Sequence, residues 1–462
     1  MTRRRIFRVF GSFLIAVTLI IGFSLTRYVL AHPNDPLQQN VASWARENRL
    51  GAVVDKLETW LHNEPPAVAP ADSLALDPDI FVDDTVAPDS PTTTVKAPAT
   101  TNKTPGTTIK KSTNTPPPAS GNSPLRVRPT VATASCPTNK LSSTTSSTST
   151  STSTSSSTST STVPVDESTT TSTTSTTTST IPSRPVNLLP QFLPSLAGEG
   201  KWKSIVKVRR VPLVYATSIR PLWCYGSVVA TAATYDPTRV HAALFNGSEM
   251  PGGSNWTNGK KISKKAVPSL LASFNGGFRF EHHPGGYFAE GKTVRPLRKG
   301  FATFAISKTG ESKVGVWGDD IRDDGTWKSL RQNLPPIVKN GKSVYANYPE
   351  VDWGQDYDNK VYNFRSAVCR RTDGLMMFVA VGKVNIRMLA DSLIVLGCST
   401  AMELDINGTW PYFAIYSDFG KSTRRGFIID KRMGDPNRHL KNSTKDFFAL
   451  FDPETLPARA VK

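Results

Sequence analysis

The sequence predicts an α+β fold that is mostly β, with a mixed sheet core and few helices. Residues 186–462 contain short alternating runs rich in Val, Phe and Tyr, and Gly, Pro, Asn and Asp separate these runs as they separate strands. Only one segment of this region shows a clear helical period. Ser, Thr and Pro dominate the preceding stretch, which has too few large apolar residues to offset its chain entropy.

The chain therefore divides into four segments. Residues 1–31 are expected to form a cytoplasmic Arg-rich end followed by a transmembrane signal anchor. Residues 32–64 form a short amphipathic helical segment, and residues 65–185 a disordered Pro/Thr/Ser-rich linker. Residues 186–462 form one folded domain, which is long enough for a single large core.

The N-terminal segment predicts a location outside the cytoplasm. Arg3, Arg4 and Arg5 precede a charge-free run from Val9 to Thr26, which has the length of a membrane-spanning helix. The arginines would keep the N-terminus in the cytoplasm. A signal peptide cut after Ala31 is the alternative, although signal peptides usually have shorter apolar cores. We expect a single-pass protein of the cytoplasmic membrane with its large domain extracytoplasmic.

The sequence between this segment and the domain predicts one helix and a spacer. Apolar residues from Val41 to His62 recur near helical spacing, so this helix packs on protein or lies at the membrane surface. Residues from Ser142 to Thr162 and from Ser168 to Thr180 are almost pure Ser and Thr, which is typical of an extended spacer.

The sequence of the domain predicts nine strands and one helix. The helix runs from Asn385 to Leu396, and Gly397 ends it as a left-handed cap. It lies between two strands, which suggests a right-handed βαβ crossover. The predicted strands are Pro212–Thr217, Ser227–Tyr235, Leu270–Phe274, Ala302–Ile306, Lys313–Trp317, Arg365–Arg370, Leu375–Val381, Ala401–Asp405 and Pro411–Ser417.

The four cysteines allow a disulfide outside the cytoplasm. Cys369 and Cys398 flank the segment before the strand at 401–405 and are the best candidates for pairing, with buried free thiols as the alternative. Cys136 lies in the linker and is expected to have no partner in the domain. No Cys or His spacing resembles a zinc site.

The charge of the domain favours an anionic partner. Residues 201–462 carry 39 Lys and Arg against 23 Asp and Glu, a balance of +16. A positive domain suits phosphorylated glycans, anionic lipids or nucleic acid. The N-terminus argues against contact with nucleic acid, and no nucleic-acid motif is present. We therefore expect no nucleic-acid partner.

The strand near residue 405 carries the strongest candidate for a site. In an extended strand Glu403, Asp405 and Asn407 would share one face, while Met402, Leu404 and Ile406 would share the other. Two carboxylates and an amide on one face indicate a solvated surface, carboxylates paired with arginine, or a substrate site.

Two further motifs can carry chemistry. Asn275, Gly276 and Gly277 follow an apolar run, so their backbone amides either form an anion-binding nest or turn a hairpin. Arg365 opens a strand and either binds a phosphate or pairs with one of the carboxylates. His283 lies in the following loop as a candidate acid or phosphate ligand.

The order of these motifs resembles the phosphodiester glycosidase family. Asn275–Phe278 matches its Asn-Gly-Gly-Phe motif, Arg365 its motif arginine and Asp405 the aspartate of its Asp-Gly-Gly-Gly-Ser motif. This chain departs from the last motif, because Ile406 and Asn407 replace two glycines. Residues 331–334 and 401–407 look like a bacterial, membrane-anchored branch of the family.

The resemblance implies a hydrolase that cleaves a sugar-1-phosphate phosphodiester, here in a cell-envelope glycan. Asp405 would be the catalytic carboxylate with Glu403 as its partner, as glycoside hydrolysis usually needs carboxylates. Asn407 would bind a sugar hydroxyl or an N-acetyl group. The phosphate would be held by Asn275, Gly276, Gly277, Arg365 and His283. The alternative is a catalytically inactive envelope-polymer binding module of the same fold.

No cofactor is expected for this reaction. Glu403, Asp405 and Asn407 together could still hold Ca²⁺, which binds carboxylate and amide oxygens. The expected partners are a phosphorylated glycan or sugar phosphate and, through the N-terminal helix, the membrane.

Overall fold

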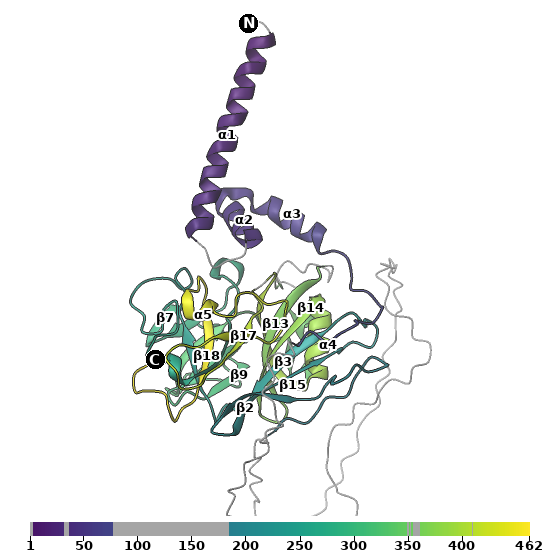
Figure 1. Ribbon diagram of the computed structural model, residues 1–462, viewed down its shortest axis with the longest axis vertical. Helices are drawn as coiled ribbons and strands as arrows, with labels where there is room; N and C mark the ends of the chain where they lie inside the picture. Colours follow the sequence, from purple (N-terminus) through teal and green to yellow (C-terminus); the bar gives the residue numbers. More distant parts are fainter. Residues whose placement is uncertain are drawn as a thin grey trace, which may run out of the picture. The chain divides into compact units, whose positions relative to one another are not determined.

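The computed structural model describes residues 3–31, 37–76, 184–348, 351, 353, 361–408 and 410–462 (Figure 1). The described residues belong to one compact unit, which combines Met1–Ala87 with Ile181–Lys462. The Ser/Thr-rich spacer, Cys136 and Thr409 lie outside the described residues.

The described part of the domain consists of three sheets. The first has the order β1 (Lys203–Val208), β2 (Val211–Ile219), β3 (Ala230–Tyr235), β14 (Met376–Val384), β13 (Asn363–Arg371), β15 (Cys398–Ile406), β11 (Val338–Lys339) and β12 (Lys342–Ser343). The second has the order β7 (Lys292–Arg295), β6 (Tyr287–Ala289), β10 (Trp327–Gln332), β8 (Ala302–Ser307) and β9 (Ser312–Val316). The third has the order β17 (Gly426–Ile428), β16 (Phe413–Tyr416), β5 (Leu270–Asn275), β18 (Phe447–Phe451) and β4 (His241–Phe245).

The fold is mostly β with few helices, as predicted, but its sheets are not mixed. Every pairing between neighbouring strands of the described sheets is antiparallel. All nine predicted strands coincide with observed ones. Strands such as β18 were not predicted because both of their faces are buried, so Phe447–Phe451 shows no polar alternation.

The first sheet lies between two hydrophobic cores. On one face Met402 and Leu404 pack with Phe274 of the third sheet and Phe304 of the second. This core is rich in aromatic contacts, such as the 4.3 Å between the ring centroids of Phe304 and Phe448. On the other face a second core lies between the sheet and helix α4. The three sheets therefore meet along β15 and its neighbours.

Helix α4 (Ile386–Val395) covers the outer face of the first sheet beside β14 and β15 (Figure 1). Asn385 caps it by accepting a hydrogen bond from the Met388 amide at 2.9 Å. Gly397 follows with a φ of 88°, as predicted for a left-handed cap. The crossover skips one strand: β13 lies between β14 and β15 and is antiparallel to both. The carboxylates of β15 lie at its C-terminal end.

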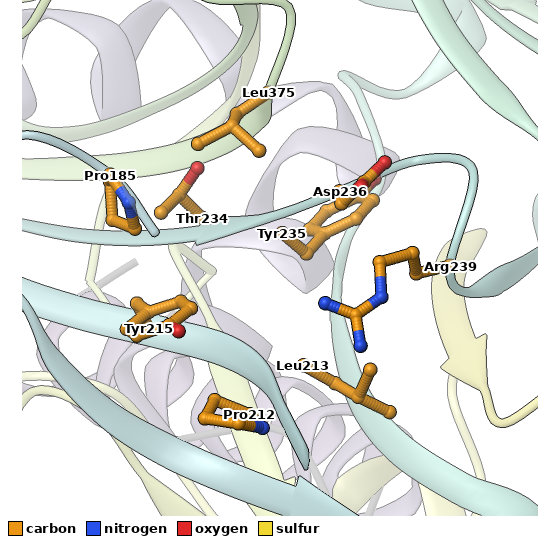
Figure 2. Close-up of a pocket in the computed structure, with 9 residues that line it drawn as sticks. All are labelled: Pro185, Pro212, Leu213, Tyr215, Thr234, Tyr235, Asp236, Arg239 and Leu375. Atoms are coloured by element: carbon orange, nitrogen blue, oxygen red, sulfur yellow. The ribbon is translucent and has the colours of Figure 1, made fainter. Parts of the chain in front are cut away.

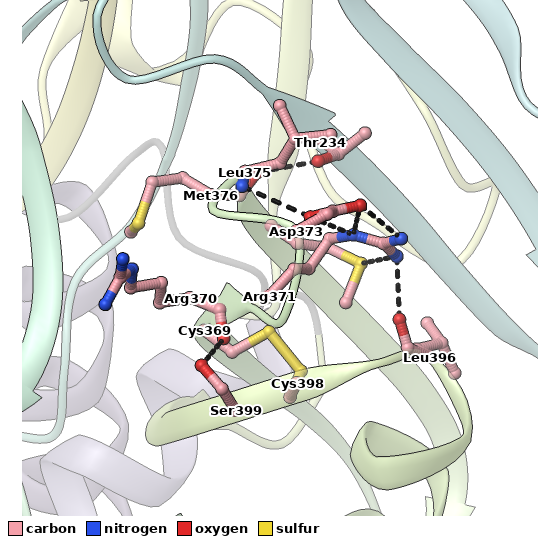
Figure 3. The surroundings of a disulfide bond; sticks show 11 residues. Thr234, Cys369, Arg370, Arg371, Asp373, Leu375, Met376, Leu396, Cys398 and Ser399 are labelled. Atoms are coloured by element: carbon pink, nitrogen blue, oxygen red, sulfur yellow. Dashed lines mark hydrogen bonds and ion pairs between the residues drawn. A yellow bond between two sulfur atoms is a disulfide. The ribbon is translucent and has the colours of Figure 1, made fainter. Parts of the chain in front are cut away.

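A disulfide joins β13 to β15. Cys369 and Cys398 are bonded, which confirms the favoured pairing. Figure 3 shows the bond beside Arg371, which pairs with Asp373 and donates a hydrogen bond to the Leu396 carbonyl at 2.7 Å. The bond therefore fixes the start of β15, the strand that carries Glu403 and Asp405.

We expect loss of this disulfide to destabilise the domain by about 3–4 kcal/mol, because it closes a segment of 29 residues in the unfolded chain. The measurement is urea unfolding of the Cys369→Ala/Cys398→Ala variant beside the oxidised protein. A Ser399→Ala variant is the control, since Ser399 is the half-buried neighbour of Cys398 on the same strand and its loss removes one hydrogen bond, to the Arg370 carbonyl at 2.8 Å. An unchanged unfolding midpoint in the double variant would contradict this expectation.

The N-terminal helices differ from the prediction. They are α1 (Arg3–Ala31), α2 (Leu37–Ala45) and α3 (Gly51–Leu61). The helix predicted from Val41 to His62 is broken within the turn η1 (Arg46–Leu50), because Asn48 and Arg49 leave helical geometry and Arg49 has a φ of 64°.

The predicted transmembrane helix is not confirmed. In α1 the described side chains begin at Ile15, and Arg27 interrupts the apolar run that follows. Across the described part of the chain, no helix combines the length and the apolar character that a membrane span needs.

The start of the predicted linker is ordered against the domain. Ala71 donates a backbone hydrogen bond to Gly226 at 2.8 Å, and Gly226 donates one to Val68 at 3.2 Å. Leu76 forms an isolated bridge with Asp430. Val68, Ala71 and Leu76, which the prediction assigned to the linker, are thus bonded to the domain. The remaining short helices are η3 (Val267–Ser269), η4 (Phe280–His282), η5 (Tyr345–Asn347) and α5 (Arg438–Lys441).

Candidate functional site

The candidate site lies where the C-terminal end of β15 meets the other two sheets. The Asp405 amide donates a hydrogen bond to the Gly276 carbonyl at 3.1 Å, which ties β15 to the end of β5. The Asn333 side chain, just after β10, donates to the Glu403 carbonyl at 2.9 Å. These bonds bring together three of the motifs that are far apart in the sequence.

A β-bulge separates the two carboxylates of β15. Ala367 of β13 pairs with Glu403, while Arg365 pairs with Ile406, so β15 has one extra residue between the two pairs. Bulges re-aim side chains and are common beside active sites. The prediction that Ile406 shares a face with Met402 and Leu404 was therefore wrong: Ile406 packs in the core under α4.

Asp405 forms a buried ion pair with Lys445. The Lys445 ammonium contacts Oδ2 of Asp405, while Oδ1 accepts a hydrogen bond from the Ile406 amide at 3.1 Å. Burial raises the pKa of Asp405, and Lys445 opposes this rise. Burial lowers the pKa of Lys445, and Asp405 opposes that fall. The two pKa values are thus driven towards each other, which suits a pair that exchanges partners or a proton.

Glu403 forms a different ion pair, with Arg365. Nη1 of Arg365 lies 2.9 Å from Oε1 of Glu403, and neither side chain is exposed. The guanidinium also donates to the carbonyls of Val384 at 3.0 Å and Trp353 at 2.8 Å. The sequence left open whether Arg365 binds a phosphate or pairs with a carboxylate, and the structure contains the ion pair. Its donors are directed at the protein interior.

The Asn-Gly-Gly motif is used mainly within the protein. Oδ1 of Asn275 accepts from the Tyr412 amide at 2.9 Å, and the Gly276 amide donates to the Asp446 carbonyl at 3.1 Å. A Cβ at Gly276 would overlap the Asp446 carboxylate, and one at Gly277 would approach Oδ1 of Asn333 to 2.9 Å. The glycines are therefore needed here for close packing. They do not turn a hairpin, because β5 and the next strand, β6, lie in different sheets.

His283 is held neutral beside a buried ion pair. Arg331 binds Asp446 through two nitrogens, at 2.8 and 3.2 Å, and donates to Nε2 of His283 at 3.1 Å. On the other side of the ring, Nδ1 accepts a hydrogen bond from the Gly285 amide at 2.9 Å and lies 3.0 Å from the Asn333 carbonyl oxygen. Burial and then Arg331 lower the pKa of His283 to about 2. An imidazole in this state is unsuited to act as a general acid.

The buried His283 makes stability dependent on pH. Its pKa is about 2 in the folded protein, against about 6.5 when unfolded, so the unfolded chain binds the extra proton between these values. The contribution of His283 to the free energy of unfolding is complete above about pH 6.5. Below this pH it falls, with a slope of about 1.4 kcal/mol per pH unit. We expect His283→Gln to flatten the decline seen by urea unfolding between pH 6.5 and 4. The exposed neighbour His282 supplies the control, His282→Gln, which should keep the decline.

Asn407 lies just beyond the bulge with a φ of 73°. Its Oδ1 is buried and accepts no hydrogen bond from the described residues. An amide in this state can take a hydrogen bond from a ligand. The described residues contain no cluster of three or more His, Cys, Asp or Glu side chains that could hold a metal ion. The calcium site considered for residues 403–407 lacks support, because each carboxylate already has a cationic partner.

Sequence reasoning missed the partners of the motif residues. Arg331 and Asn333 were noted only as part of a family-like fragment, without a role. Lys445 and Asp446 precede the apolar strand β18 and carry no local signal, because only the tertiary fold brings them to Asp405 and Gly276. Trp410, whose ring centroid lies 4.5 Å from Nζ of Lys445, also went unpredicted.

The pocket in Figure 2 is remote from this site in the sheet. It is lined by residues of β2 and β3, among them Tyr215 and Tyr235, together with Arg239 and Leu375. None of the candidate catalytic or binding residues lines it. We therefore assign this pocket no part in the proposed site.

Comparison with known proteins agrees with the motif order. Residues 269–405 match the model of the phosphodiester glycosidase family, and this match spans Asn275, Arg365 and Asp405. The resemblance predicted from the sequence is thereby confirmed, whereas the bacterial, membrane-anchored branch stays a prediction. No curated protein matches the chain.

Three solved structures are similar to the chain. The catalytic domain of zebrafish N-acetylglucosamine-1-phosphodiester alpha-N-acetylglucosaminidase, auto-inhibited by its pro-peptide, is 17% identical, and the match covers 54% of this chain and 87% of that one with a TM-score of 0.37. A hypothetical protein from Synechocystis is 10% identical, with 55% and 64% covered and a TM-score of 0.37. A protein from Burkholderia pseudomallei described as exported is 12% identical, with 50% and 75% covered and a TM-score of 0.32.

Proposed function

We propose that this chain, whose residues 269–405 match the phosphodiester glycosidase family, is a hydrolase that cleaves a sugar-1-phosphate phosphodiester in a cell-envelope glycan. Asp405 supports this proposal most directly. It ends the family match and carries a buried carboxylate at the meeting of the three sheets. The basic charge of the domain suits a phosphorylated polymer.

In the reaction, the bond between C1 of the sugar and the phosphate oxygen breaks, and water supplies the new oxygen at C1. A phosphate ester leaves readily, so the main tasks are to stabilise positive charge at C1 and to deliver water. Asp405 would perform these as nucleophile or general base. Asn407 would bind a sugar hydroxyl or N-acetyl group through its unused Oδ1. The released proton passes to the phosphate monoester or the solvent.

Glu403 and Arg365 support this chemistry indirectly, through the position of Asp405. Their ion pair is fully buried and lies on β13 and β15, the two strands that form the bulge at Asp405. Asn275 acts in the same way, since its side chain donates at 3.1 Å to Ser366, which in turn donates at 2.6 Å to the Asp405 carbonyl. These residues position the carboxylate.

We also propose that the large domain works outside the cytoplasm. The disulfide between Cys369 and Cys398 supports this location, because such bonds persist in oxidising compartments. Addition of a protease to intact cells should degrade the domain. Protection of the domain until the cells are lysed would sink this proposal.

The test of the activity uses the full chain. Purified protein is incubated with UDP-N-acetylglucosamine and a panel of sugar-1-phosphodiesters, and the free sugar is quantified. Release of sugar together with the phosphate monoester supports the proposal.

A second candidate function is an inactive binding module for envelope polymers. The replacement of two motif glycines by Ile406 and Asn407 favours it, because β15 extends to Ile406 and Asn407 follows it, where the family has a flexible glycine loop. Binding of a phosphorylated polymer without release of sugar across the panel would favour this candidate over the hydrolase.

A further inference from the structure

Lys445 is a buried cation to which the proposed reaction assigns no role. It lies between α5 and β18, on a segment fixed by backbone hydrogen bonds: the Thr444 carbonyl accepts from the amides of Glu249 and Met250, both at 3.0 Å. The Ser443 hydroxyl donates to the Lys445 carbonyl at 2.7 Å. The backbone therefore holds the side chain towards Asp405.

The surroundings of the Lys445 ammonium are unusual for a purely structural residue. Its side chain is 7% exposed, and its contacts are the Asp405 carboxylate and the face of Trp410. Burying a lysine and an aspartate together is costly, and apolar side chains of similar volume often give equal or greater stability. A buried, ionisable pair at a candidate site therefore points to a functional role.

Two buried arginines near the site are already held by protein partners. Arg365 binds Glu403 and backbone carbonyls, and Arg331 binds Asp446 through two nitrogens. Each planar guanidinium is locked by this geometry. An ammonium has three donors that can rotate, so Lys445 can accept a new anionic partner without moving the backbone.

We propose that Lys445 receives the phosphate of the substrate, and that its ion pair with Asp405 opens when the phosphate binds. This proposal rests on the proposed function and names the residue that recognises the leaving group. In the free protein Asp405 satisfies Lys445. A phosphate oxygen then accepts a charge-assisted hydrogen bond from Nζ, and the carboxylate is released for the sugar.

The connectivity of the substrate makes this arrangement productive. One oxygen joins C1 to phosphorus, so a cation that holds the phosphate beside Asp405 also brings C1 next to the carboxylate. Lys445 would further neutralise the charge that develops on the departing phosphate. Trp410, on which the ammonium rests, keeps water from the ion pair in the free state and offers an apolar surface next to the sugar.

The decisive experiment measures binding, so it does not depend on turnover. Calorimetry is performed with N-acetylglucosamine 1-phosphate on the wild-type chain, Asp405→Asn, Lys445→Met and the double variant. Removal of the competing carboxylate should tighten binding about 10-fold in Asp405→Asn, while Lys445→Met should weaken it about 100-fold, the worth of one hydrogen bond between charged groups. The double variant should bind as weakly as Lys445→Met. Lys445→Arg should restore part of the affinity.

Control variants and a second substrate separate recognition from stability. Lys441→Met alters an exposed lysine of the same segment and should leave binding unchanged. In turnover, Lys445→Met should lose about 100-fold in kcat/KM on UDP-N-acetylglucosamine but little on 4-nitrophenyl α-N-acetylglucosaminide, which has no phosphate. The plateaus of the pH profiles are compared, because loss of Lys445 removes the interaction that opposes the raised pKa of Asp405.

The outcomes distinguish the two proposals. Tight binding that depends on Lys445, without any turnover, would retain the phosphate site and overturn the hydrolase. Equal affinities of Asp405→Asn and the double variant would overturn the role of Lys445 whatever the activity. Equal loss on both substrates would also overturn it, because a residue that only supports the fold affects both alike.

Discussion

Asp405→Asn should reduce sugar release by at least about 1,000-fold while the protein remains folded. The variant keeps the size of the side chain and an oxygen for the Ile406 amide, but it loses the negative charge that a nucleophile or base needs. The assay quantifies free sugar from UDP-N-acetylglucosamine with the variant and the wild type side by side. Thermal unfolding of both confirms that the fold is kept.

Asp418→Asn is the matched control, because Asp418 is exposed and lies in the β16–β17 connection, where it pairs with Lys421. It should retain full turnover. Retention of turnover by Asp405→Asn on a verified substrate would remove Asp405 from the mechanism and leave the family match without its catalytic carboxylate.

The pH dependence of the activity tests the role of Asp405 independently. Burial raises the pKa of Asp405 above its usual value, and the reaction needs the ionised form. Activity should therefore fall as the pH drops through a value above about 3.8–3.9, the ordinary pKa of an aspartate. His283 does not shape this profile, since it stays neutral down to a pKa of about 2.

The strands and the single βαβ unit were predictable because their signals are local. Alternation, the Asn385 cap and Gly397 each act within one element, and the structure contains all of them. The antiparallel character of the sheets was not predictable, because β13 enters between β14 and β15 from an earlier part of the chain. The break at Asn48 and Arg49 also lacks a local signal in an otherwise regular apolar pattern.

The site was only half predictable for a similar reason. The motif residues carry their own signals, but their partners do not. The bulge at Asp405 depends on the register with β13, and Lys445 reaches Asp405 from 40 residues further along the chain. The same fold that supplies Lys445 to Asp405 supplies Arg365 to Glu403. Two carboxylates that look equivalent in the sequence thus have different environments.

Glu403→Gln tests this difference and should cost about 3–5 kcal/mol of stability. The substitution removes the carboxylate that pairs with the buried Arg365, which is far more costly than replacing both partners. Urea unfolding at pH 7 measures the loss. Glu403→Met combined with Arg365→Met should lose less than the sum of the two single variants, because the double variant buries no charge.

Asp391→Asn provides a control of the opposite kind. Asp391 pairs with Arg387 on the exposed face of α4, and exposed pairs contribute at most about 1 kcal/mol. If Glu403→Gln were as mild as this control while abolishing turnover, Glu403 would act on the substrate and not through the position of Asp405. A large loss of stability, with kcat/KM recovered in part by the double methionine variant, would make Glu403 and Arg365 the support on which the position of Asp405 depends.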